Sequence, residues 1–266
     1  MSHPLKLLNT NPAWPSFTGQ ATFIGSSPSQ LVHVYVDSTL GVDGTQNAKN
    51  LIADSDRVLG INQKIFAVPS QSVNVLIYAI GGKTDGTGGA DHAACDFLTG
   101  GNIEVCASFG NPARVSALFE AEYSECCMNG NLCGVSTGEA LSRWCATVVS
   151  GNALADFATA PYWFKNGMPD FVTKTDNTDQ NGLSTGCAMA FISWLRSLGF
   201  DLDKIAPAMV ALGAKGALVY TMAIISTTAK MSIMAMIYIL AMLFIAPLIY
   251  LDGCGESMQI SLNPTH

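Results

Sequence analysis

The segment PARVSALFEAEYSECCM (residues 112–128) decides the fold that the sequence predicts. It begins with a proline, which suits the first turn of a helix, and its apolar residues recur at helical spacing. Three glutamates interrupt this otherwise apolar pattern: Glu120, Glu122 and Glu125. Glu122 and Glu125 are three residues apart and therefore share one face of the predicted helix. The segment predicts a central, core-forming helix that carries acidic groups.

The segments around this helix indicate an α+β fold. Before it, the sequence predicts a strand, a long helix, a buried strand and a hairpin bracketed by Cys95 and Cys106: residues 31–37, 44–66, 73–80 and 95–106. After it, three more helices are predicted, at residues 138–151, 182–198 and 204–212. The predicted architecture is a small sheet packed on a central helix, a mainly helical second half and a C-terminal hydrophobic helix.

The composition excludes some classes of protein. Of the 266 residues, 49% are hydrophobic and only 12% are charged, so a disordered chain is excluded. The chain has 13 basic and 20 acidic residues and no cluster of Lys or Arg. A nucleic-acid partner is therefore not expected, because such surfaces carry basic clusters that track phosphates.

The excess of apolar residues lies toward the C-terminal end. Residues 1–215 are expected to form a globular domain, and residues 216–266 a hydrophobic C-terminal segment. Within it, residues 231–251 contain no charge, and as a helix they would span about 31 Å, the thickness of a hydrocarbon core. The sequence thus predicts a transmembrane helix, a C-terminal membrane anchor and a membrane localisation. A buried helical hairpin, or a tail not original to the domain, remains an alternative.

Seven of the eight cysteines lie between residues 95 and 187. Cys95 and Cys106 bracket a predicted Thr-Gly-Gly turn, so we expect a disulfide between them if the protein is exported. Cys127 and Cys133 bracket a second turn. The N-terminal residues lack the apolar run of a signal peptide, which favours the cytosol instead. The redox compartment therefore stays open.

A third acid, Glu139, lies in the helical segment GEALSRWCA (residues 138–146). Glu122, Glu125 and Glu139 come from two helices joined by a short turn, so they could converge on one site. In the alternative interpretation the acids form ordinary exposed helix pairs, Glu120 with Arg114 and Glu139 with Arg143. These two interpretations predict opposite burial for the acids.

The order of elements over residues 31–200 resembles that of the zincin metallopeptidases, and GEALSRW resembles the glutamate helix of their gluzincin branch. In that branch an H-E-x-x-H motif supplies two histidine ligands and a general-base glutamate, and a later glutamate is the third ligand. The resemblance implies that Glu122 is the catalytic base and Glu139 a metal ligand. Both histidine positions depart from the motif, since they hold Ala121 and Glu125. The stretch STGCAMAFISWL (184–195) also resembles uncharacterised bacterial proteins without an assigned activity.

The resemblance implies a degenerate scaffold, and the residues expected to hold a possible divalent cation are Glu125, Glu139 and His92. His92 is the one histidine close to the expected site along the chain. Mainly carboxylate ligands favour calcium, magnesium or manganese, so conventional zinc proteolysis is not expected. A peptide or protein ligand could bind along the sheet edge by strand addition. The alternative is a membrane-anchored structural or interaction protein with no active site, and whether the protein is an enzyme stays open.

Overall fold

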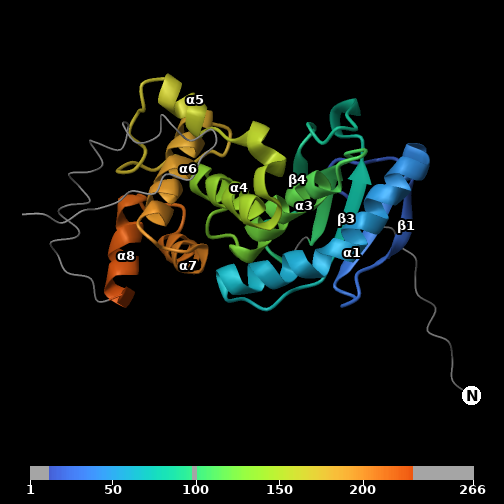
Figure 1. The fold of residues 1–266 in the computed structure, drawn as a ribbon, viewed down its shortest axis with the longest axis horizontal. Coiled ribbons are helices and arrows are strands. Elements are labelled where there is room, and N and C mark those ends of the chain that lie inside the picture. The colour runs from blue at the N-terminus through green and yellow to red at the C-terminus, as the bar shows by residue number, and fades with distance from the viewer. Residues whose placement is uncertain (1–11, 98–100, 230–266) are drawn as a thin grey trace, which may run out of the picture. The chain divides into compact units, whose positions relative to one another are not determined.

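The structure, a computed structural model, describes residues 12–97 and 101–229. One compact unit extends to Thr221, slightly beyond the boundary expected after residue 215. Its sheet has five strands in the order β1-β2-β3-β5-β4 (Figure 1). The strands are β1 (Ala21–Ser26), β2 (Val32–Asp37), β3 (Val73–Tyr78), β4 (Ala90–His92) and β5 (Asn102–Cys106). The three inner strands are parallel, and β1 and β4 run antiparallel at the two edges. This mixed sheet, with its helices, confirms an α+β fold.

Helices cover one face of the sheet. Alternate residues of the inner strands are buried there, for example Val34, Val75 and Ile103, each with no exposed surface. Helices α1 (Gly41–Phe66) and α3 (Pro112–Cys127) pack against this face (Figure 1). The apolar face of the strands, which follows a period of two, therefore packs against the apolar faces of α1 and α3, which follow the helical period, and together they form one core.

The second half of the unit is helical. It contains α4 (Ser136–Ser150), the 3₁₀ segment Gly151–Phe157, α5 (Ala160–Lys165), α6 (Gly182–Ser197) and α7 (Leu202–Leu212). Small side chains, Ala117 and Ala121 of α3 and Ala146 of α4, pack together and let these two helices approach closely. The last helix described is α8 (Val219–Ala229).

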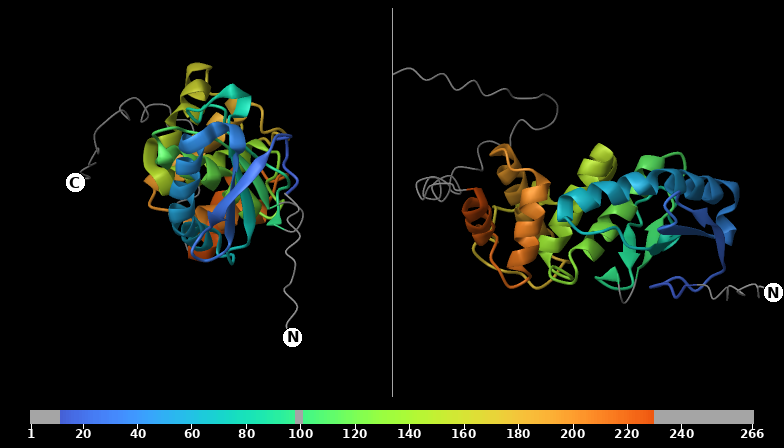
Figure 2. Two further views of the ribbon diagram at one scale, coloured as in Figure 1. Left: turned by 90° about the vertical axis from the view of Figure 1, so that its right-hand side faces the viewer. Right: turned by 90° about the horizontal axis from the view of Figure 1, so that it is seen from below.

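The other face of the sheet is covered by the segment that precedes β1, which we call the N-terminal strap (residues 13–17; Figure 2). The backbone N–H groups of Ser16 and Phe17 donate to Glu104 Oε1 at 3.0 and 2.7 Å, and the Ser16 hydroxyl donates to Oε2. Trp14 packs edge-on against Tyr35. Glu104 is fully buried in β5, so these donors satisfy a carboxylate that water does not reach.

Two strands differ from the sequence prediction. β1 was not expected, because its sequence ATFIGS is half polar, and its side chains are mostly accessible at the sheet edge. The predicted hairpin also has another register. Its first strand is β4, in the glycine-rich loop, and it pairs His92 with Ile103 and Ala90 with Val105.

This register explains why the predicted Cys95–Cys106 disulfide is wrong. Cys95 lies beyond the end of β4 and is bonded to Cys133, while Cys106 is a buried free thiol. The Cys106 thiol donates to the carbonyl of Lys83 instead. The disulfide therefore joins the chain after β4 to the turn between α3 and α4. Cys127, which brackets the same turn as Cys133, is free and buried.

The structure contradicts the predicted membrane anchor. Within residues 12–97 and 101–229, no helix has the length and apolar character needed to cross a membrane. Helix α8 has 11 residues, about 16 Å, roughly half of a hydrocarbon core. The segment 231–251, on which the prediction rested, lies outside the described residues. The predictions of a membrane partner and a membrane localisation are corrected on the same finding about the described helices.

Candidate metal centre

The residues singled out by the sequence lie around one cavity of about 390 Å³. His92 is the last residue of β4, Glu122 and Glu125 lie in α3, and Glu139 lies in the first turn of α4. All four line the cavity. The structure therefore brings together the groups predicted to converge, although none of their roles is tested by this placement.

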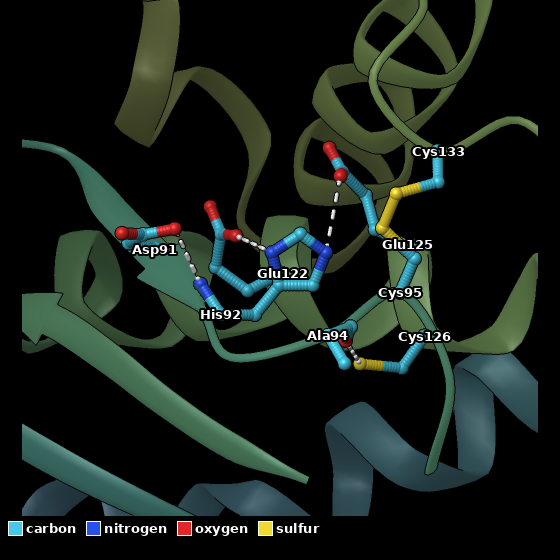
Figure 3. The surroundings of a disulfide bond; sticks show 8 residues. All are labelled: Asp91, His92, Ala94, Cys95, Glu122, Glu125, Cys126 and Cys133. Carbon is cyan, nitrogen blue, oxygen red and sulfur yellow. Dashed lines mark hydrogen bonds and ion pairs between the residues drawn. A yellow bond between two sulfur atoms is a disulfide. The ribbon is translucent and has the colours of Figure 1, made fainter. Parts of the chain in front are cut away.

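The imidazole of His92 lies between two carboxyl groups (Figure 3). Its Nδ1 is 3.3 Å from Glu122 Oε2, and its Nε2 is 3.5 Å from Glu125 Oε2. One ligand atom from each of these three residues lies within 4.8 Å of the others. The ligand atoms around a bound ion are about 3 to 3.5 Å apart, given bonds of about 2.1 Å. Because a cation bonds only one ring nitrogen, the imidazole or one of the two carboxyl groups would have to turn for all three residues to bind the same ion.

Local structure explains this convergence. Glu122 and Glu125 share the face of α3 that looks toward β4, as their spacing predicts. The disulfide Cys95–Cys133 fixes the chain three residues after His92, and the N–H of Gly130 donates to the carbonyl of Cys95 at 3.0 Å. These two links hold the loop after β4 against the end of α3. The disulfide and the hydrogen bond thereby hold β4 and α3 together next to the site.

Glu139 is placed by the start of α4. Gly138, the preceding residue, packs so closely on the backbone carbonyl of Leu132 that a Cβ would collide with it. The carboxylate of Glu139 accepts from Arg143 Nε at 2.8 Å and pairs with Nη2 of the same guanidinium. This is the Glu139–Arg143 pair that the alternative interpretation expected, but it is only partly exposed and lines the cavity.

Burial and mutual repulsion keep protons in the site. Burial, and then the charge of Glu139, raises the pKa of Glu125 from 4.5 to about 8. Burial also raises the pKa of Glu122 well above its ordinary value, with the charge of Glu125 as the next cause. Burial lowers the pKa of His92, so the imidazole is favoured in its neutral, metal-binding form. A cation that binds here would displace the protons of the carboxyl groups.

Glu120 does not belong to the site. Its side chain is fully buried on another face of α3, where Asn62 Nδ2 donates to Oε2. Arg114, its partner in the alternative interpretation, instead pairs with Asp156 at 2.7 Å. Burial raises the pKa of Glu120, which favours the neutral acid. Glu120 is thus a buried carboxyl on the same helix and away from the cavity.

Several polar cavity residues were not found from the sequence, and three of them bear on the site. Asp91 adjoins His92 in β4, whereas Asp179 and Thr185 come from the loop before α6 and from its first turn. Asp179 lies in the polar stretch TKTDNTDQNG, where nothing in the pattern distinguishes it from its neighbours. The adjacency of Asp91 to His92 is the one available signal. The other two depend on the packing of α6 against α4.

A scan against protein-family models and a search of curated proteins both find no match for this chain.

Proposed function

We propose that the protein binds a divalent cation through His92, Glu122 and Glu125, in a metallopeptidase-like pocket that receives a peptide. The observation that carries this proposal is the set of three ligand atoms within 4.8 Å of one another beside a cavity. An imidazole held between two buried carboxyl groups costs free energy without a cation, since the carboxyl groups must stay protonated. A bound cation would relieve this cost.

The order of elements supports a zincin-like scaffold. A mixed sheet with an antiparallel edge strand precedes a central acidic helix and a helical second half. The ligand set we propose departs from the gluzincin motif in three ways. The imidazole comes from the edge strand, Glu122 is a ligand rather than the base, and Glu139 is not a ligand. Glu139 instead positions Glu125 and Arg143.

The donor set favours a first-row divalent ion. One imidazole and two carboxylates suit manganese or zinc better than calcium, which prefers six to eight oxygen ligands. This revises the expectation from the sequence, which already included His92 but gave more weight to the carboxylates than to its nitrogen. Three protein ligands leave coordination positions for water or a ligand carbonyl on the cavity side.

The edge strand supports a peptide as the ligand. β4 is the outer strand of the sheet, and it ends at His92, so an extended segment paired with it would reach the cavity. The N–H of His92 donates to Asp91 Oδ1, its own neighbour, at 2.8 Å. A peptide could take over this donor, so metal and peptide would meet at His92.

Manganese or zinc is expected to stabilise the protein more than calcium does. At a concentration about 100 times the dissociation constant, a ligand of the native state contributes roughly 2.7 kcal/mol. For a domain of this size the melting temperature should rise by about 5–10 °C. The measurement is thermal unfolding of EDTA-treated full-length protein, titrated with each ion at pH 7.5.

The variants separate a metal site from general cation binding. Glu122→Gln and Glu125→Gln should each abolish most of the shift, because an amide is a poor ligand and carries no charge. Glu120→Gln is the matched control, since it changes a buried glutamate of the same helix outside the cavity. Equal shifts in all three variants, or none in the wild type, would support instead an interaction protein with no metal site.

A further inference from the structure

The cavity carries more negative charge than one divalent cation neutralises. Five carboxyl groups line it, those of Asp91, Glu122, Glu125, Glu139 and Asp179, against the single guanidinium of Arg143. A divalent ion at the proposed site would leave about two formal negative charges. The excess lies with the carboxylates that are not proposed as metal ligands.

Arg143 does not balance Asp91 and Asp179. Its guanidinium is held by Glu139, and Nη1 donates to the carbonyl of Phe157 at 2.5 Å. The described contacts of Asp91 and Asp179 are with neutral donors, the N–H of His92 and the side-chain amide of Gln180. Both residues line the same cavity as His92. Two carboxylates without a cationic partner in the described part of the chain therefore point to a cation from outside.

Thr185 is an independent sign of a ligand. It is only 1% exposed and lines the cavity, and its Oγ1 has no hydrogen-bond partner. Buried hydroxyl groups are normally hydrogen-bonded, because an unmade bond costs free energy. An N–H donor in the cavity would satisfy this oxygen.

The charge and the donor requirement favour an organic cation over a second metal ion. Among the described residues, the one set of ligand atoms spaced for a metal is that of His92, Glu122 and Glu125. The remaining carboxylates form no such set. The volume is also that of a pocket for a small organic group, within the usual range of about 300–1,000 Å³.

We propose that Asp91, Asp179 and Thr185 form a subsite for the positively charged side chain of a lysine or arginine in the peptide ligand. The two carboxylates would pair with the ammonium or guanidinium group, and Thr185 Oγ1 would accept one of its N–H groups. This inference rests on the proposed function, because it specifies the peptide that the same pocket receives.

The test uses manganese-loaded full-length protein and three capped peptides. These are acetyl-Ala-Lys-Ala-amide, the norleucine peptide of similar shape without charge, and the glutamate peptide, compared by isothermal titration calorimetry. We expect the lysine peptide to bind at least about tenfold more tightly than the norleucine peptide, as charge-assisted hydrogen bonds allow. Binding of the glutamate peptide should be weaker than both.

Variants locate the subsite. Asp179→Asn and Thr185→Val should each remove most of the preference for lysine. Thr185→Val should leave the manganese-induced rise in melting temperature, because it changes no charge near the metal ligands. Asp203→Asn is the charge-matched control, because this exposed residue of α7 does not line the cavity. Equal affinity for the lysine and norleucine peptides, or no binding of either, would overturn the subsite.

The same titrations separate this proposal from the metal site. A manganese response without a lysine preference overturns the subsite alone. Without a manganese response the proposed function fails, and the peptide comparison is then made with the metal-free protein. In the metal-free protein, a preference for the lysine peptide that Asp179→Asn removes would support the subsite. The absence of this preference would overturn the subsite.

Discussion

The metal-free protein is expected to lose stability as the pH rises from about 4.5 to about 8. The pKa of Glu125 is raised from 4.5 to about 8 in the folded state, so the folded state binds more protons than the unfolded state over this range. The stabilisation is full below pH 4.5 and is lost as the pH passes 8. Because one pKa unit corresponds to about 1.36 kcal/mol, the loss is on the order of 5 kcal/mol.

The groups that face Glu125 modify this trend. Glu122 acts in the same direction, because its pKa is also raised. His92 acts in the opposite direction below about pH 6.5, since its pKa is lowered by burial. Glu139 and Asp179 add to the repulsion that raises the pKa of Glu125.

Urea unfolding at pH 5, 6, 7 and 8, in EDTA, measures this dependence. Glu125→Gln should flatten it, because the amide does not titrate. Glu120→Gln should remove another part of the pH dependence of stability, since the pKa of that buried acid is raised as well. A second series with manganese in place of EDTA distinguishes the two contributions, because a bound ion should remove only the pH dependence that comes from the cavity acids. A wild-type stability that rises steadily from pH 5 to 8 in EDTA would contradict the protonated state of the site.

Loss of the Cys95–Cys133 disulfide is expected to cost about 4 kcal/mol. The bond closes a loop with a sequence separation of 38, and chain-entropy arguments give this magnitude for a loop of that length. The double variant Cys95→Ser, Cys133→Ser should therefore unfold at lower urea concentration than the oxidised wild type. Reduction of the wild type with dithiothreitol should produce the same loss and should not affect the double variant.

The disulfide should also affect metal binding. Cys95 is three residues from His92, so its release would loosen the loop that fixes the imidazole. We expect weaker manganese binding in the double variant. Peptide mapping without reduction checks the pairing and should find Cys95 linked to Cys133, with Cys106 free. A Cys95–Cys106 peptide would contradict the register of the sheet.

The sequence predicted the elements whose periodicity is strong. The strands around Val34 and Val75, and the helices that carry Glu122 and Glu139, follow directly from alternation and from helical spacing. β4 was not predicted, because three residues after a glycine-rich loop give no periodic signal. The error in the disulfide followed from the missing strand, since a hairpin register cannot be set when one of its strands is misplaced.

The residues of the candidate site were likewise predicted only in part. Helical spacing placed Glu122 and Glu125 on one face, and the short turn before α4 brought Glu139 near them. Thr185 and Asp179 depend on contacts between α6 and α4, which lie far apart along the chain. No local pattern encodes such contacts, so these residues became visible only in three dimensions.

The N-terminal strap has a practical consequence for any shortened form of the protein. Trimming the chain to the first residue of the sheet, Ala21, would look conservative from strand boundaries alone. It would remove three donors to Glu104, leaving it the Tyr78 hydroxyl at 3.2 Å, and would expose the aromatic rings of Tyr35 and Tyr78. Such a fragment would expose an apolar patch around an acid that has lost most of its donors, and its aggregation would be easily mistaken for a property of the native fold.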